Sequence, residues 1–169
     1  SMALRVPDAR IIDERSSPLG WLAVVESPTI PFRHAPGMSL SCFHEPPAQL
    51  AVFVDGDAQN TIVHYDGSRD PLRYLDCMTS ALPYHLLDMH AVLVLGAGGG
   101  SDVLTAIYNG ARAIDAVELD PNMVDLVRSD YRDFAGDIYG RLDVRVHVAE
   151  ARGFVSRSSG SRPYDLIQV

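Results

Sequence analysis

A glycine-rich turn between two apolar runs is the feature of this sequence best suited to chemistry. Residues 92–95 are apolar and lead into Gly96, Gly98 and Gly100, a helical pattern follows, and a second apolar run ends at Glu118, 22 positions after Gly96. Such a turn exposes backbone N–H groups at the start of a helix, and glycine has no Cβ that would block a ligand. An acid at the tip of the second strand can accept hydrogen bonds from both hydroxyls of a ribose. The spacing therefore predicts a nucleoside-binding site.

The residues around the turn narrow the choice of nucleoside. Ser101 stands where the dinucleotide fingerprint has a third glycine. All 14 basic residues are arginine, so the chain has no lysine to bind phosphates in a P-loop. These observations disfavour NAD and ATP and favour an adenosyl-sulfur ligand that carries no phosphate.

Charge and composition restrict the class of partner. The formal net charge is −8 and the arginines are scattered, which argues against a nucleic-acid groove. The summed field of an acidic protein can attract a cationic substrate. The six histidines show no metal-ligand spacing, and His147 is expected at the surface, so we expect no metal site. No apolar run reaches the roughly 18–20 residues that cross a membrane.

The two cysteines bear on the compartment. Cys42 and Cys77 lie far apart in the chain and form no CxxC pattern. They are expected to be small buried thiols rather than a disulfide pair. Free thiols are typical of a reducing compartment, and the sequence shows no signal peptide, so we predict a cytoplasmic protein.

The chain divides into two expected regions. Residues 1–68 form a small antiparallel β region, with strands over 20–26, 40–43, 49–54 and 60–65, a turn at 55–57, and no element before residue 19. Residues 69–169 form an α/β domain with a parallel sheet. It opens with a helix from Asp70, the expected N-cap, to Met89, interrupted at Pro83.

Strands and helices alternate in the second region. Strands are expected over 91–96, 113–118, 143–148 and 164–169, and helices over 100–109, 121–133 and 150–157. The sequence predicts a Rossmann-like fold. The last strand would be an unprotected edge, so we expect a fragment whose parent continues, and a second copy of the chain that could cover the edge in a homo-oligomer.

The chain resembles the spermidine synthase family (polyamine aminopropyltransferases), within the Rossmann-like S-adenosylmethionine-dependent transferases. The similarity covers residues 17–169 and lies in the segments SPLGWLAVVES, VDGDAQ, VLVLGAGGGSD, AVELD, HVAEARGFV and YDLIQV, together with the helix that holds Tyr74 and Asp76. The resemblance implies a small N-terminal β domain packed on a Rossmann-like domain, with the active site between them.

The resemblance also implies roles for individual residues. The cofactor, S-adenosylmethionine or its decarboxylated form, would lie beside Gly96, Gly98 and Gly100. Glu118 would hold the ribose, Glu150 and Ala151 the adenine, and Gln59 the sulfur end. An amine or another small-molecule acceptor would lie near Tyr74 and Asp76, with Asp102 as a further candidate. Plain alternatives are a solvated acid at Glu118, a helix N-cap at Glu150, a hairpin polar residue at Gln59, a half-buried helix tyrosine at Tyr74 and a first-turn helix acid at Asp102.

Departures from the family pattern leave three functions open. The family has an aspartate at the position of Gly99, which binds the amine tail of the decarboxylated cofactor, a histidine at Leu75, and a catalytic aspartate that would follow Val169. The first hypothesis is aminopropyl transfer to an amine. The second is methyl transfer from S-adenosylmethionine, since Gly99 leaves room for the cofactor carboxylate. The third is a nucleoside-binding or interaction module without catalysis.

Overall fold

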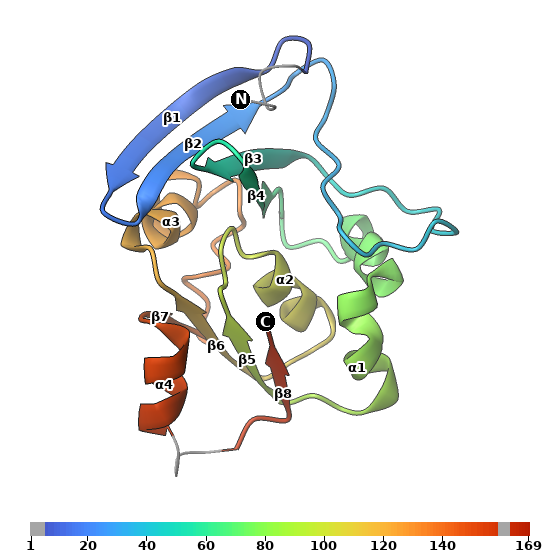
Figure 1. Ribbon diagram of the computed structural model, residues 1–169. Helices are drawn as coiled ribbons and strands as arrows, with labels where there is room; N and C mark the ends of the chain where they lie inside the picture. The colour runs from blue at the N-terminus through green and yellow to red at the C-terminus, as the bar shows by residue number, and fades with distance from the viewer. Residues whose placement is uncertain (1–5, 159–162) are drawn as a thin grey trace.

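Two four-stranded sheets form the fold of the computed structural model, which describes residues 6–158 and 163–169 (Figure 1). The first sheet is antiparallel, with the order β1–β2–β3–β4. Its strands are β1 (Arg10–Ser17), β2 (Gly20–Glu26), β3 (Gln49–Val54) and β4 (Ala58–Val63). The hairpin expected between the last two strands is confirmed: Asp55 and Gly56 both have positive φ, as a tight Asp-Gly turn requires.

The second sheet is parallel, and its order β7–β6–β5–β8 confirms the Rossmann-like α/β class. The strands are β5 (Ala91–Leu95), β6 (Ala113–Glu118), β7 (Val144–Val148) and β8 (Leu166–Gln168), and the helices between them include α2 (Ser101–Tyr108), α3 (Pro121–Asp125) and α4 (Ala151–Ser158). The chain builds outward from β5 in one direction and then returns to its other side. Ligands bind such sheets beyond the carboxyl ends of the strands at this reversal.

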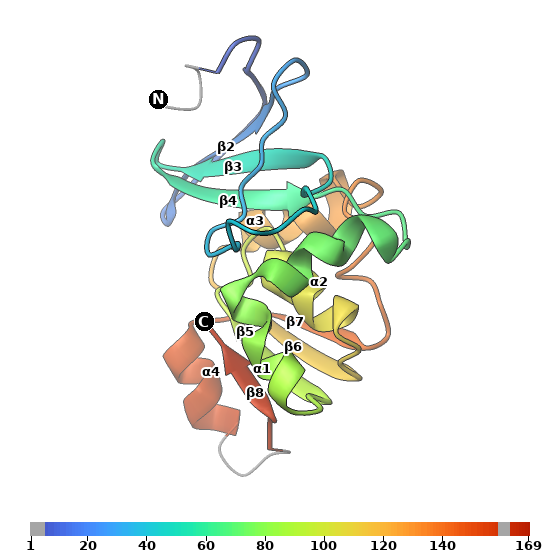
Figure 2. The same ribbon diagram turned by 90° about the vertical axis from the view of Figure 1, so that its right-hand side faces the viewer.

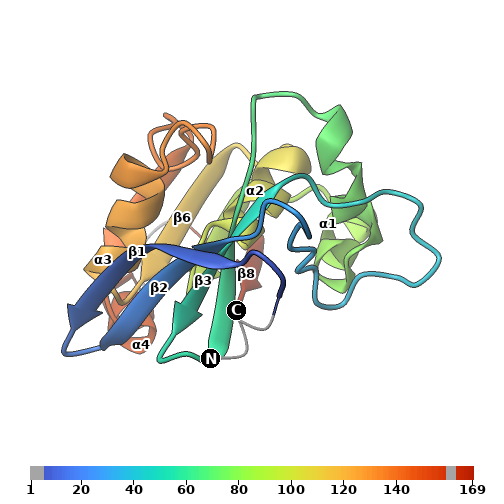
Figure 3. The ribbon, with the colours of Figure 1, turned by 90° about the horizontal axis from the view of Figure 1, so that it is seen from above.

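The antiparallel sheet lies across the carboxyl ends of the parallel strands (Figures 1 and 3). One hydrophobic cluster spans both sheets and includes Val52 and Ile62 from the first, Val92 from the second, and Leu104 from α2. The shared core therefore holds the N-terminal sheet against the turn after β5. The proposed boundary between residues 68 and 69 falls in the connection between the two sheets and stays a prediction.

Two expectations for the N-terminal region are wrong. β1 forms where no element was expected, because Arg10 to Ser17 pair along β2 while their side chains only alternate between exposed and half-buried. That long-range pairing leaves a weak local signal. The strand expected over 40–43 is absent from the described structure, since Leu40 lies in a turn, Phe43 has no regular secondary structure, and both side chains are fully exposed.

The helix expected over residues 70–89 is broken into three pieces, which are η2 (Asp70–Cys77), η3 (Thr79–Ala81) and α1 (Leu82–Leu86). The break falls at Met78 and not at Pro83, because Met78 takes an extended conformation and its backbone bridges to Met38. Asp70 is the first helical residue, and the N-cap is Arg69.

The helix expected over 121–133 is also shorter. It consists of α3 and a π-helical turn, η4 (Leu126–Asp130). The expected start is confirmed, since the side chain of Asp120 accepts a hydrogen bond from the N–H of Asn122 at 2.9 Å and Pro121 begins the helix.

The expectation of two free thiols is wrong, because Cys42 and Cys77 form a disulfide with a Cα–Cα distance of 5.8 Å. The connection between β2 and β3 descends toward η2 and α1 (Figure 2) and makes the contact possible. The N–H of Ser39 donates to the carbonyl of Cys77 at 2.9 Å and brings the two segments together. Disulfides are typical of oxidising compartments, which speaks against a cytoplasmic location. That location stays a prediction.

Candidate functional site

The glycine turn after β5 has the geometry that its composition requires. Gly96, Gly98 and Gly100 have φ values of 75°, 51° and 90°, in the left-handed region that side chains with a Cβ disfavour. The N–H groups of Gly96 and Ala97 donate to the carbonyl of Val117 at 2.8 and 3.0 Å. The turn is thus fixed to the end of β6, at the point where the sheet reverses its direction of growth.

Glu118 lies directly beneath this turn. Its Oε2 accepts a hydrogen bond from the N–H of Gly98 at 2.8 Å, and its Oε1 accepts one from the N–H of Asp120 at 2.9 Å. The side chain is half-buried, and each oxygen of a carboxylate can accept more than one hydrogen bond. The acid is therefore held in a fixed orientation and keeps capacity for a further donor such as a ribose hydroxyl.

The two ends of the turn have different surroundings. Gly96 is exposed, and a Cβ built there would meet no atom within 4 Å. At Gly99 a Cβ would overlap the carbonyl oxygen of Thr61 in β4, and at Gly100 it would lie 2.5 Å from Cδ1 of Ile138. The Gly96 side of the turn is therefore open, and the N-terminal sheet closes the Gly99 side. This contact leaves no room for an aspartate at position 99.

The buried Tyr139 holds the turn from another direction. Its hydroxyl donates to the carbonyl of Gly98 at 3.1 Å. Burial and the nearby Glu118 carboxylate raise the pKa of this phenol, so it keeps its proton.

A cavity of about 420 Å³ lies beside the turn, between β4, the connection from β2 to β3, the segment of η2, η3 and α1, the start of α2, and β8. Tyr74 and Asp102 line it, as do Asn60, Thr61 and Gln168, which sequence reasoning did not single out. Among the side chains that line it, Asp102 is the one carboxylate and none is an arginine. The cavity therefore favours a neutral or cationic occupant over an anionic one.

The candidates near the cavity are not all brought together. Tyr74 is buried in its wall, and burial raises the pKa of its phenol to about 12. Asp76 is exposed and outside the lining; it accepts a hydrogen bond from the hydroxyl of Tyr108 at 2.6 Å and faces Nε2 of His85 at 3.8 Å. Gln59 is half-buried in β4, outside the lining.

Glu150 and Ala151 stand at the start of α4, after β7. The carboxylate of Glu150 accepts hydrogen bonds from the N–H groups of Arg152 and Gly153 at 2.9 and 2.6 Å, and these bonds lower its pKa. This is the N-cap geometry that the sequence left as an alternative. The N–H of Ala149 donates to the carbonyl of Glu118 at 2.9 Å, so the two acid-bearing segments lie side by side.

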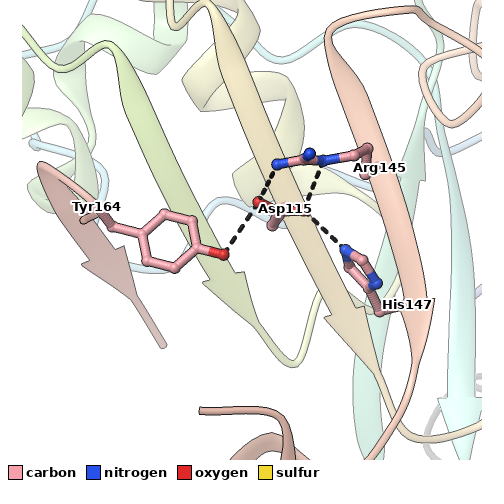
Figure 4. Close-up of polar contacts among 4 residues, drawn as sticks. All are labelled: Asp115, Arg145, His147 and Tyr164. Carbon is pink, nitrogen blue, oxygen red and sulfur yellow. Dashed lines mark hydrogen bonds and ion pairs between the residues drawn. The ribbon is translucent and has the colours of Figure 1, made fainter. Parts of the chain in front are cut away.

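A polar cluster around the buried Asp115, which sequence reasoning missed, crosses the parallel sheet (Figure 4). Asp115 accepts hydrogen bonds from Nε and Nη2 of Arg145 at 3.0 and 2.7 Å, contacts Nε2 of His147 at 2.7 Å, and accepts one from Tyr164 at 3.0 Å. Burial raises the pKa of Asp115, but these bonds outweigh it and the net shift is downward. His147 is thus half-exposed and held in a cluster. The signal available in the sequence was Asp115, a charged residue inside an apolar strand. The structure pairs it directly with Arg145 in the neighbouring strand.

The fold is that of a Rossmann-like α/β protein with an antiparallel sheet over the carboxyl ends of the parallel strands. Two solved structures of spermidine synthases share this architecture, one in complex with the transition state analogue AdoDATO and one from Thermotoga maritima. Each has a TM-score of 0.61 and 14% sequence identity, and each match covers 94% of this chain. The chain spans 46% and 45% of the lengths of these two proteins. At this identity the likeness shows the fold alone.

The other comparisons do not assign the chain to a family. No protein-family model matches the chain, and no curated protein matches its sequence. Within residues 6–158 and 163–169, no helix is long and apolar enough to cross a membrane. In the same ranges, no three metal-binding side chains converge on a point.

Proposed function

We propose that the chain binds an S-adenosylmethionine-type nucleoside at the glycine turn, as part of a transferase. The observation that carries this proposal is the fixed position of the Glu118 carboxylate beneath the turn, beside the open face of Gly96. Gly96, Gly98 and Gly100 bring the backbone close to the ligand, and Glu118 accepts the ribose hydroxyls. The solved spermidine synthase with a bound transition state analogue supports the choice of ligand class.

The remaining ligand residues extend this proposal along the sheet edge. Glu150 and Ala151 lie beside Glu118 through the contact of Ala149, so we place the adenine there. Because the Glu150 oxygens already accept two backbone N–H groups, the adenine would use the remaining acceptor capacity. Gln59 is kept as a candidate for the sulfur end.

The reaction we favour is transfer of an aminopropyl group to an amine. The sulfonium activates the adjacent carbon, an amine nitrogen attacks that carbon, the C–S bond breaks, and the amine loses a proton. The cavity next to the turn suits the amine, because Asp102 is the one side-chain carboxylate in its lining and Tyr74 adds an aromatic wall. Asp76 stays a candidate substrate ligand. The residue that removes the proton is expected after Val169.

Gly99 favours methyl transfer as a second candidate. Without an acid at this position, the turn lacks the counter-charge for the amine tail of decarboxylated S-adenosylmethionine, and the contact with Thr61 fills the space that an acid would need. A carboxylate-bearing cofactor would then be preferred. The third candidate is a nucleoside-binding module without catalysis, in which only the glycine turn and Glu118 would have a function.

Isothermal titration calorimetry tests these alternatives with S-adenosylmethionine, its decarboxylated form and methylthioadenosine. Preference for the decarboxylated form supports aminopropyl transfer, and preference for the carboxylated form supports methyl transfer. Methylthioadenosine binding alone supports the module. Glu118→Gln should weaken all binding by about tenfold or more, because a charged acceptor is lost. Glu14→Gln, at an exposed position of β1, is the matched control. Binding that is absent, or indifferent to Glu118→Gln, would overturn the proposal.

A further inference from the structure

Gln168 is a buried polar residue in an otherwise apolar strand. It lies in β8 with 9% of its surface exposed, and its side chain reaches the wall of the cavity. An amide that is buried without partners is costly, so its hydrogen bonds indicate why a polar residue is tolerated here.

The amide of Gln168 joins three elements. Its Nε2 donates to Oδ1 of Asp102 in the first turn of α2 at 2.6 Å, and its Oε1 accepts a hydrogen bond from the hydroxyl of Tyr84 in α1 at 3.2 Å. The two contacts fix the orientation of the amide. If the amide turned over, its oxygen would face the Asp102 carboxylate and its NH₂ group would lose that acceptor.

We infer that Gln168 is a positioning residue that holds the Asp102 carboxylate in the cavity wall as the seat for a cationic group of the ligand. The inference deepens the proposed function and rests on it. A carboxylate in a partly desolvated wall keeps its charge only when hydrogen bonds or counter-charges compensate for lost water. Among the residues that the structure describes, no arginine lines the cavity. Gln168 therefore supplies the compensation in the free protein, and an ammonium or sulfonium group would add to it in the complex.

The other titratable side chains near Asp102 are held in their neutral forms, so the Asp102 carboxylate is the main charge in the cavity wall. His34 lines the same cavity, and burial lowers the pKa of its imidazole, which favours the neutral form. Burial raises the pKa of both Tyr74 and Tyr84, so the two phenols stay protonated. Burial also raises the pKa of Asp102, and the hydrogen bond from Gln168 acts in the opposite direction. Removing Gln168 should therefore protonate Asp102 at a higher pH.

Two measurements on the full chain test this inference. The first follows the Asp102 carboxyl carbon by NMR between pH 3 and 9 in the free wild-type protein and in Gln168→Met, which keeps the side-chain length and loses both hydrogen bonds. The second measures the affinities for decarboxylated S-adenosylmethionine, which is cationic, and for methylthioadenosine, which is neutral, over the same pH range. Tyr84→Phe is a milder variant that removes only the hydroxyl that donates to Gln168. Asp88→Asn, exposed and outside the cavity lining, controls for net charge.

We expect Gln168→Met to move the Asp102 titration to higher pH and to weaken binding of the cationic ligand about tenfold at neutral pH, while methylthioadenosine binds unchanged. Tyr84→Phe should act in the same direction with a smaller effect, and Asp102→Asn should remove the difference in pH dependence between the two ligands. If Gln168 had only a structural role, its replacement would weaken the binding of both ligands equally.

The outcomes separate this inference from the function on which it rests. If Asp102 titrates identically in wild type and Gln168→Met, the inference fails whatever the ligands do. If the variant weakens both ligands alike or neither of them, it also fails. If the wild type binds neither nucleoside, the proposed function fails. The role of Asp102 in binding a ligand cation then fails with it, even if Gln168→Met shifts the Asp102 titration.

Discussion

Gly99→Ala tests how closely the N-terminal sheet rests on the glycine turn. A Cβ at position 99 would overlap the carbonyl oxygen of Thr61, and it would lie 2.5 Å from the carbonyl carbon of that residue and 3.2 Å from the nitrogen of Ile62. These are main-chain atoms of a paired strand, so no side-chain rotation can relieve the overlap. Overpacking costs about 1–3 kcal/mol, and we expect the upper end, about 3 kcal/mol, because strand or turn must move.

Gly110→Ala is the matched control for this substitution. Gly110 has a φ of +81°, and a Cβ there would meet no atom within 4 Å, so its cost is that of the left-handed backbone alone, about 1–2 kcal/mol. Gly99 is outside the left-handed region. Both variants reduce the freedom of the unfolded chain equally, so the difference between their losses is the cost of the overlap at Gly99 minus the cost of the left-handed backbone at Gly110.

Urea unfolding followed by circular dichroism measures the two losses, with m-values compared to exclude a change in the unfolded state. Gly99→Ala should lower the free energy of unfolding by about 1–2 kcal/mol more than Gly110→Ala does. An equal or smaller loss would refute the close contact between β4 and the turn. The explanation for the missing acid at position 99 would be refuted with it.

Two further predictions concern parts of the fold that position the site. Reducing the disulfide of Cys42 and Cys77, which are 35 residues apart in sequence, should lower the free energy of unfolding by about 3–4 kcal/mol through chain entropy. The Cys42→Ser, Cys77→Ser double variant should match the reduced protein. An unchanged urea midpoint after reduction would contradict this expectation. Asp115→Asn should cost about 2 kcal/mol at pH 7, since it weakens charge-assisted bonds to His147 and to the solvent-exposed Arg145. The pKa of Asp115 is lowered in the folded state, so this stabilisation is present above about pH 4 and is lost as the pH falls through the folded-state pKa. If the urea midpoints of Asp115→Asn and of the wild type fell in parallel toward acid pH, the prediction would be contradicted.

Local sequence signals predicted the parts of the fold that local physics determines. The strands 91–96 and 113–118, the turn between them, and the Asp120 cap depend on apolar runs, glycines and a cap-plus-proline pair that lie next to one another in the chain. The hairpin of β3 and β4 likewise depends on Asp55 and Gly56. In each case the deciding interactions join residues that are near in sequence.

The features that the sequence did not reveal depend on contacts between distant segments. β1 is fixed by its pairing with β2, the disulfide by the descent of the β2–β3 connection, and the break at Met78 by its bridge to Met38. The Asp115 cluster and Gln168 are polar residues within apolar strands, and their partners stand on other elements. Spacing within one element carries no information on such partners.

The contact at Gly99 and the position of Asp102 are two sides of one arrangement. Because the carbonyl of Thr61 occupies the space beside Gly99, an acid that serves the cavity cannot stand in the turn. Asp102 comes three residues later, in the first turn of α2, where the helix N-terminus favours a negative charge. It lines the cavity there, and Gln168 can reach it from β8. A ligand that spans the site would therefore place its ribose at Glu118, cross the open face of Gly96, and end with its cationic group farther along α2 than an acid in the turn would allow. A crystal structure with decarboxylated S-adenosylmethionine in which the ammonium lies against the turn and away from Asp102 would contradict this path.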